Sequence, residues 1–141
     1  MAAATMTVSV VSPEKVLFTG ESTQVITRIL GSGEIAFLPG HAAFLGALSE
    51  NHTRIYLADG TITDVAVHNG FVEVSNNNVN ILSDVAELGD QIDRARALKA
   101  KERAEAAIQH SQDADAEAAL ARAHARLNAT GGLHGTSAGN H

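Results

Sequence analysis

The sequence predicts an all-β sandwich at the N-terminus, followed by an antiparallel two-helix hairpin at the C-terminus. Up to about Leu88 the chain is rich in Val, Ile, Thr and Phe in short alternating runs, which is typical of half-buried strands. From Asp90 it turns to Ala, Arg, Glu, Lys and Gln, residues that favour helix. No Pro or Gly interrupts this second part before Gly131, so the helical pattern is continuous.

Length and composition restrict the class of protein. The 141 residues suit one ordinary domain with a small appendage, and the absence of Cys excludes disulfides and thiolate metal sites. The net charge of -6 is negative, which disfavours binding to the phosphate backbone of a nucleic acid. No apolar run reaches the roughly 18–20 residues of a membrane span, and the first residues lack the pattern of a signal peptide. We expect a chain that faces the cytosol and does not itself enter a membrane.

Short apolar runs separated by turn residues predict the strands of the first part. Turn signals are Asp59-Gly60, Asn69-Gly70 and the run of Asn at 76–78. Because the strands are half apolar, they require a second sheet, and a sandwich of about eight to ten short strands satisfies them. The expected strands are Thr7–Ser12, Lys15–Thr19, Ser22–Leu30, Glu34–Leu38, Arg54–Leu57, Thr61–His68, Gly70–Ser75 and Val79–Ser83.

Two helices are expected in the second part, Asp90–Gln109 and Ala114–Leu127. The four residues between them form a turn, with Ser111 or Asp113 as the N-cap of the second helix. A connection this short makes the two helices antiparallel neighbours. The expected organisation is therefore a sandwich at 1–88, a helical hairpin at 89–128 and a disordered tail at 129–141.

The apolar seam of the hairpin is thin, because most of its members are alanine. At about 0.8 kcal/mol per buried CH2, its few larger side chains contribute only a few kcal/mol. This favours a hairpin held loosely enough to leave its resting place, although an alanine-rich helix pair that stays docked fits the composition equally well. The seam residues are Ala97, Ala100, Ala104, Ala107 and Ile108 on the first helix, and Ala116, Leu120, Ala123 and Leu127 on the second.

Enzyme signatures are scarce. The sequence has no phosphate-binding loop, no H-E-x-x-H and no G-x-S-x-G motif. Metal ligation by His52 and His68 has no support from their spacing. His41, with Glu34 to orient it, is a candidate base, but no nucleophile or set of oxyanion donors accompanies it. A histidine that follows Pro-Gly in a loop is more often an interaction or turn residue.

One constellation suits an anionic ligand. Arginine forks that project from one helix face fit a polyphosphate, and a nearby carboxylate fits an amine or a ribose hydroxyl. The alternative is a solvated face on which Asp93 merely pairs with Arg96. The residues concerned are Ile92, Asp93, Arg96 and Arg103 of the first helix, joined by Arg122 and Arg126 of the second.

Four runs carry a resemblance to a known family: "VVSPEKVLFTG", "GEIAFLPGHAAFLGAL", "GFVEVSNNNVNILSDVAE" and "IDRARALKAKERAE". Over roughly Met6 to Asn128 the chain resembles the epsilon subunits of rotary F-type ATP synthases. The pattern departs from the family at Ala36, Ala43 and Asn69, where Gly, Pro and Gly are frequent. These departures are mild, since Asn tolerates positive φ better than other residues with a side chain.

The resemblance implies a non-catalytic subunit of the central stalk, peripheral on the cytoplasmic face of a bacterial membrane. Its sandwich would bind the gamma subunit and sit on the c ring, with Glu34 and His41 at the c-ring contact. The helices would rest on the sandwich or extend into the alpha and beta subunits and obstruct ATP hydrolysis. No cofactor is required, but the six residues from Ile92 to Arg126 match a motif that senses a regulatory ATP. The rival interpretations are a stand-alone nucleotide-binding β-sandwich module and an enzyme that uses Glu34 and His41.

Overall fold

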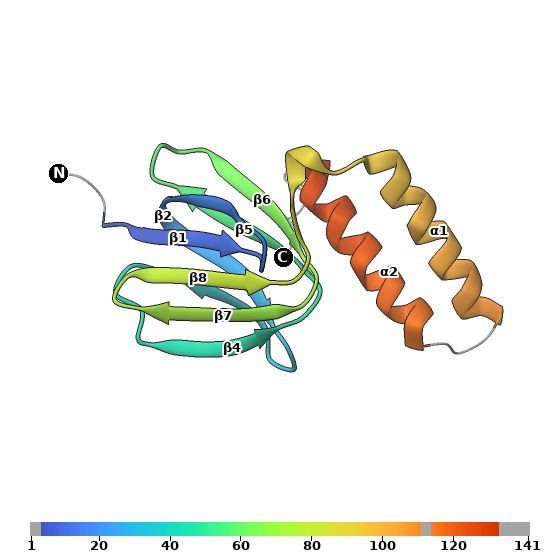
Figure 1. Cartoon of the computed structure of the whole chain (residues 1–141), viewed down its shortest axis with the longest axis horizontal. Helices are drawn as coiled ribbons and strands as arrows, with labels where there is room; N and C mark the ends of the chain where they lie inside the picture. The colour runs from blue at the N-terminus through green and yellow to red at the C-terminus, as the bar shows by residue number, and fades with distance from the viewer. Residues whose placement is uncertain (1–3, 111–113, 133–141) are drawn as a thin grey trace.

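The computed structural model describes residues 4–110 and 114–132 of the chain. They form a nine-stranded β-sandwich with two antiparallel helices along one side of it (Figure 1). The predicted fold class is therefore confirmed. The strands are β1 Met6–Val11, β2 Val16–Ile29, β3 Gly33–Phe37, β4 Phe44–Leu48, β5 Asn51–Leu57, β6 Ile62–Val67, β7 Gly70–Ser75, β8 Asn78–Ser83 and β9 Ala86–Leu88. The helices are η1 Gly89–Gln91, α1 Arg94–His110, α2 Ala114–Leu127 and the π-helical η2 Asn128–Gly132.

Strand β2 is the long strand that joins the two layers. Its first half pairs with β1, and its second half pairs with β3 and β5, all antiparallel. The sheet order is β1-β8-β7-β4-β2-β5-β6-β9, with β1 and β8 parallel. In Figure 1, β1, β8, β7 and β4 form the front layer, and β5 and β6 lie behind them. Because β2 takes part in both layers, the sandwich closes on itself.

The core between the layers follows the alternation of the strands. In β6, Val65 and Val67 point inward and are fully buried, so Asp64, Ala66 and His68 share the opposite face. The largest fully buried apolar side chains are Phe37, Met6, Ile55, Ile81, Val8, Val10, Val25, Val65, Val67, Val72 and Val74. From Asp64 to His68 the outward face of β6 is largely shielded from solvent, because the helices cover it, whereas Ile62 at the start of the strand is 38% exposed.

Helix α2 lies against the outer face of β5 and β6, and α1 packs on the far side of α2 (Figure 1). The apolar contact between sandwich and helices is small. Ala66 of β6, Ala125 of α2 and Ala129 of η2 form a buried cluster, with Ile92 packed at its side. Within the hairpin the buried residues are again alanines, namely Ala97, Ala104, Ala116 and Ala123. The thin seam expected from the sequence is confirmed, and the hairpin is docked.

The strands differ from expectation in three places. The expected strands Lys15–Thr19 and Ser22–Leu30 are one continuous strand, β2, since β1 pairs along its first half up to Ser22. Strand β4 was not expected, because Phe44–Leu48 contains Gly46 and no β-branched residue; pairing with β7 decides its conformation. The three-residue β9 was also missed, and it forms by pairing with β6.

The helical part begins and ends later than expected. Residues 89–91 form a 3-10 turn, Ile92 is extended, and α1 starts only at Arg94. Asp93 caps it, since its Oδ1 accepts the backbone N–H of Arg96 at 3.0 Å. At the other end η2 continues the chain, and Ala129 is 1% exposed, so 129–132 belong to the hairpin rather than to a tail. The expected N-caps Ser111 and Asp113, and residues 133–141, lie outside the described residues.

A substitution at the start of β7 tests the close pairing of β7 and β8. Gly70→Ala is expected to lower the free energy of unfolding by roughly 2–4 kcal/mol, measured by urea denaturation. An added Cβ would lie 1.9 Å from the Leu82 carbonyl oxygen, and Gly70 has φ +153°. The control is Gly31→Ala, where φ is +79° but no atom lies within 4 Å. Strain alone should cost about 1 kcal/mol there. Equal losses in the two variants would contradict the steric cause.

Candidate functional site

The sandwich and the hairpin meet where two backbones approach closely. Gly89, the first residue of η1, lies against Ala129 of η2, and a Cβ added to Gly89 would be 2.0 Å from the Ala129 carbonyl oxygen. No side chain fits between them. The segment that follows α2 is therefore in direct backbone contact with the segment that links β9 to α1. We call this contact between Gly89 and Ala129 the joint, and two pockets lie near it.

The first pocket, which we call the arginine pocket, has a volume of about 340 Å3. That volume falls within the range of about 300–1,000 Å3 found for small-molecule sites. Its lining residues are Glu87, Gln91, Ile92, Asp93, Arg96, Ala97, Ala100, Arg103 and Arg126. Five of the six residues proposed from the sequence are thus brought together. The sixth, Arg122, lies half-buried on α2 and is not among the lining residues.

The charges of the arginine pocket suit an anion. Arg96, Arg103 and Arg126 contribute three guanidinium groups, opposed by the carboxylates of Asp93 and Glu87. Asp93 uses one carboxylate oxygen, Oδ1, to accept the backbone N–H of Arg96. The arginine forks can donate to phosphate oxygens, while the carboxylates can accept from an amine or a hydroxyl.

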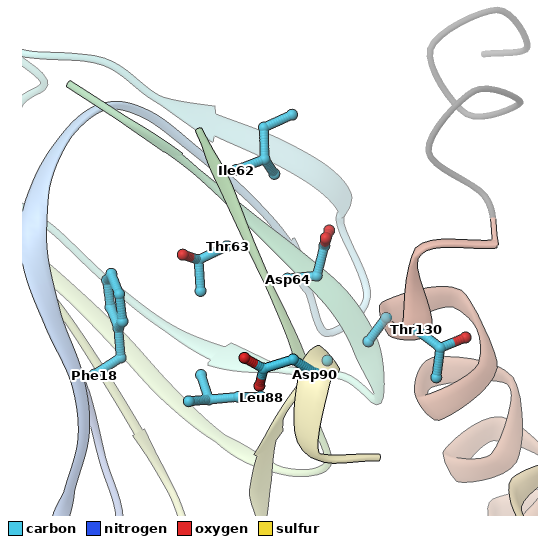
Figure 2. A pocket seen from close by; sticks show the side chains of 9 residues that line it. Phe18, Ile62, Thr63, Asp64, Leu88, Asp90 and Thr130 are labelled. Atoms are coloured by element: carbon cyan, nitrogen blue, oxygen red, sulfur yellow. The ribbon is translucent and has the colours of Figure 1, made fainter. Parts of the chain in front are cut away.

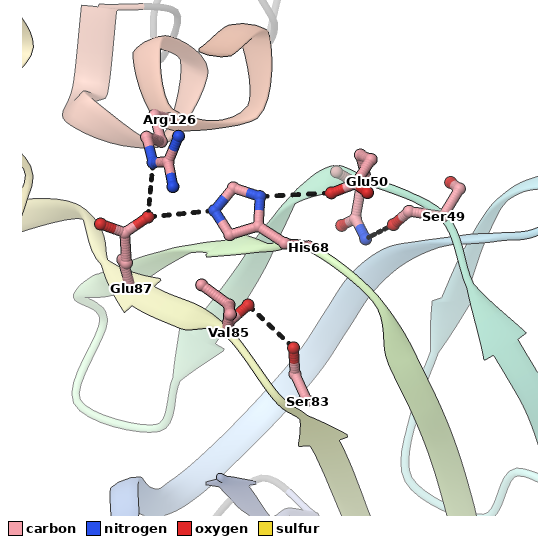
Figure 3. A network of polar contacts seen from close by, with 8 residues as sticks. Ser49, Glu50, His68, Ser83, Val85, Glu87 and Arg126 are labelled. Atoms are coloured by element: carbon pink, nitrogen blue, oxygen red, sulfur yellow. Dashed lines mark hydrogen bonds and ion pairs between the residues drawn. The ribbon is translucent and has the colours of Figure 1, made fainter. Parts of the chain in front are cut away.

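A polar network links this pocket to the sandwich (Figure 3). Arg126 Nε donates to Glu87 Oε1 at 2.7 Å, and the same oxygen lies 3.0 Å from Nε2 of His68. The other ring nitrogen of His68, Nδ1, is 3.2 Å from Glu50 Oε2. Burial alone would raise the pKa of the Glu87 carboxyl, but hydrogen bonds from Arg126 and His68, and their charges, lower it below the usual 4.5. Sequence reasoning missed Glu87 and Glu50, because nothing local marks either as a partner of a distant arginine.

The second pocket, about 350 Å3, includes both residues of the joint, Gly89 and Ala129, in its lining and lies between β6 and η2 (Figure 2). Phe18, Ile62 and Leu88 provide an apolar wall, and Asp64 and Asp90 provide its charge. Gly89, Thr63, Ala129 and Thr130 complete the lining. With two carboxylates and no cationic side chain in its lining, this pocket disfavours a phosphate ligand, in contrast to the arginine pocket.

The two histidines considered as metal ligands are bound to carboxylates instead. His52 Nε2 lies 2.6 Å from Asp64 Oδ1 on the neighbouring strand, and His68 lies between Glu50 and Glu87. Within residues 4–110 and 114–132, no group of three or more His, Cys, Asp or Glu side chains is placed to hold a metal ion.

Glu34 and His41 occupy different elements. Glu34 is exposed on β3, paired in register with Arg28 of β2. His41 follows β3 in a loop, where its Nδ1 donates to the Ala42 carbonyl at 2.7 Å and its ring packs edge-on against Phe37 at 4.9 Å. Gly40 donates to the Asn77 side chain at 2.7 Å, which ties the loop to the β7–β8 turn. The carbonyl of Ala42, rather than Glu34, orients the imidazole, so this geometry does not support the acid-base pair of the enzyme interpretation.

The fold and the arginine pocket together define a small two-part protein in which a helical hairpin with an arginine-lined pocket docks on a β-sandwich. Comparison with known proteins agrees. Residues 5–89 match the family described as ATP synthase, Delta/Epsilon chain, beta-sandwich domain. Residues 90–131 match the companion long alpha-helix domain. The chain belongs to the ATP synthase delta/epsilon chain family.

This chain matches curated relatives over nearly their full length. The ATP synthase epsilon chain of Desulfitobacterium hafniense (strain DSM 10664 / DCB-2) is 44% identical over 130 residues, which span 90% of this chain and 97% of that one. The ATP synthase epsilon chain of Streptomyces avermitilis is 39% identical over 127 residues, with 90% and 96% covered.

Among solved structures, a chain of the Euglena gracilis mitochondrial ATP synthase (OSCP/F1/c-ring) shares the fold. Its TM-score is 0.77 at 22% identity, with 92% of this chain and 83% of that chain covered. In the described part of this chain, no helix combines the length and apolarity that a membrane span requires.

The lowered pKa of Glu87 predicts that acid weakens docking. Because the pKa is lower than in an unpaired carboxyl, the stabilisation is fully present above about pH 5 and is lost as the pH falls through the lowered value. The chain has no Cys, so dyes on Thr19→Cys and Leu98→Cys would report the distance between sandwich and hairpin by energy transfer.

Transfer efficiency should be constant from about pH 8 to about pH 5 and fall below that range. The control is Glu87→Gln, which should dock more weakly at neutral pH and lack this acid-dependent loss. Circular dichroism of the sheet identifies the pH at which the sandwich itself unfolds. A parallel decline in both proteins would show that Glu87 is not the cause.

Proposed function

We propose that this chain is a central-stalk subunit of a proton-translocating F-type ATP synthase, which couples rotor rotation to ATP synthesis and restrains ATP hydrolysis with its C-terminal helices. It acts without catalytic residues of its own, at the cytoplasmic face of a bacterial membrane. Family membership supports the coupling role, as does the fold shared with a chain of an F1/c-ring assembly. The observation that carries the restraining role is the contact between the two parts. Small alanines and an ion pair hold α2 to the sandwich, so release exposes little apolar surface.

The gamma subunit is the partner proposed for the front layer. Phe71 of β7 is directly paired with Leu82 of β8 and with Ala47 of β4, so the three share one outer face, and Leu45 lies two residues from Ala47 on that face. Leu45, Phe71 and Leu82 are 71%, 55% and 45% exposed. A group of exposed apolar side chains on adjacent strands is typical of a protein interface. The hairpin docks on the other layer, so gamma could occupy this face without displacing the helices.

The c ring is the partner proposed for Glu34 and His41. The loop that carries His41 is held by its hydrogen bond to Asn77 and by the packing of the imidazole on Phe37 and Phe44. A loop fixed in this way presents polar groups at defined positions. Polar groups at such a contact give register more than affinity.

Removal of the hairpin tests the restraining role. ATP hydrolysis by the complete enzyme assembled with a chain that ends at residue 89 should be several-fold faster than with the full chain, because the helices can no longer enter between alpha and beta subunits. ATP synthesis driven by a proton gradient should persist, since the sandwich remains. Unchanged hydrolysis would contradict the restraint but leave the coupling role.

A regulatory ATP is the ligand proposed for the arginine pocket. Arg96, Arg103 and Arg126 would bind the phosphates, and Asp93 and Glu87 are available to the amine or the ribose. The pocket is built from β9, the Ile92–Asp93 segment and both helices, so a ligand there stabilises the docked hairpin. ATP would therefore favour the docked state in proportion to its preference for that state.

Two arginines that differ in position test the ATP proposal. Arg103→Gln should weaken ATP binding to the isolated chain by about tenfold or more, because it removes a charged donor from the pocket. Arg122→Gln should change the affinity less than about twofold, since Arg122 is not among the lining residues. Isothermal titration calorimetry measures both. Equal effects would place the nucleotide elsewhere, and very tight binding without any partner would favour the stand-alone nucleotide-binding module.

A further inference from the structure

His68 is a buried imidazole for which the proposed function has no role so far. It follows β6 and is 2% exposed. Each of its ring nitrogens faces a carboxylate oxygen, Nδ1 that of Glu50 at 3.2 Å and Nε2 that of Glu87 at 3.0 Å (Figure 3). An ionised carboxylate only accepts hydrogen bonds, so whichever ring nitrogen carries a proton donates it to one of the two acids.

The position of His68 follows from strand alternation. Asp64, Ala66 and His68 share the face of β6 that α2 covers, and Glu87 of β9 is paired directly with Ala66 on that face. Glu50, His68 and Glu87 all belong to the sandwich. They therefore form one cluster that does not need the hairpin, whereas Arg126 reaches it only when α2 is docked.

The cluster holds the Glu87 side chain in the position in which it accepts the hydrogen bond from Arg126. A glutamate side chain that is 35% exposed has several rotamers, and fixing them offsets most of what an exposed ion pair contributes. Here Nε2 of His68 contacts the same oxygen, Oε1, that accepts from Arg126 Nε at 2.7 Å. Because His68 already holds that oxygen in place, docking loses less side-chain entropy. The bond uses Arg126 Nε, which leaves the terminal nitrogens of the fork for the arginine pocket.

We propose that His68 is a positioning residue that acts through Glu87 on Arg126, so that the Glu50–His68–Glu87 cluster sets how firmly the hairpin docks. This inference rests on the movable hairpin of the proposed function. The docked state would then depend on residues of the sandwich as well as on the arginines of the helices.

The experiment measures the undocked fraction in the isolated full-length chain without nucleotide. Ala125 is 3% exposed in the cluster with Ala66 and Ala129, and the chain has no other thiol, so Ala125→Cys reacts with a thiol reagent only when the hairpin is released. Leu98→Cys, at a site 44% exposed, gives the unhindered rate. The ratio of the two rates reports the undocked fraction even when that fraction is small.

A double-mutant cycle then separates positioning from general stability. His68→Leu should raise the protected rate about tenfold in the wild-type background and leave it unchanged when Arg126→Gln is already present. Equal effects of His68→Leu in both backgrounds, or no effect in either, would overturn the proposal. Glu50→Gln, which keeps the side-chain shape, should raise the reaction rate of Ala125→Cys by a smaller factor, and again only when Arg126 is present. This variant replaces His68→Leu if His68→Leu fails to fold.

The outcome is distinct from that of the proposed function. If the complete enzyme hydrolyses ATP at the same rate with and without residues 90–141, the restraint of hydrolysis is contradicted. The double-mutant cycle still reports whether His68 acts through Glu87 on Arg126. If Ala125→Cys stays unreactive even with Arg126→Gln, the ion pair does not hold the hairpin, and the positioning role of His68 is overturned.

Discussion

The contact between α2 and the outer face of β5 and β6 is the interaction on which the rest of the structure depends. It is made from side chains that bury little apolar area, chiefly Ala66, Ala125 and Ala129. Small residues allow the helix to lie close to the sheet, and Gly89 allows the backbone of η2 to touch the linker. Such a contact fits closely but contributes little hydrophobic free energy. The Glu87–Arg126 ion pair, at 2.7 Å, adds a polar contact between the sandwich and α2. A larger apolar contact would hold the helices more firmly but make their release costly.

Docking also creates the arginine pocket. Its walls come from the sandwich, the linker and both helices, so they would separate if α2 left the sandwich. Under the proposed function, ligand binding and docking of the hairpin are thus coupled. The ligand stabilises the docked state, and docking raises the affinity for the ligand by the same free energy. Arg126 takes part in both, since it pairs with Glu87 and lines the pocket. The second pocket beside the same joint is lined by Asp64 and Asp90 and by no arginine, so the two pockets differ in charge although both lie near the joint.

Much of the fold could be predicted, because alternation and helix-forming composition are local properties. Strands β5 to β8 and both helices follow from them. Where tertiary pairing overrides local preference the sequence was less informative: β4 and β9 are strands because β7 and β6 pair with them. The start of α1 was recoverable in principle, since Asp93 is a good N-cap, but continuous helix-forming composition placed it too early. Of the arginine pocket, Ile92, Asp93, Arg96 and Arg103 lie close together in the chain, which is why they could be proposed together.

By itself, the sequence determined the two-part plan, the thin alanine seam and the arginines that the helices present, because periodicity, propensity and charge are written along the chain. Only the tertiary structure decided which groups the arginines meet. Arg126 and Glu87 are 39 residues apart, and no local pattern couples them. The burial of His68 between two acids depends on the pairing of β6 with its neighbours and on the helix that covers them. Contacts of this kind arise when separate elements pack, so their chemistry exists only in the folded chain.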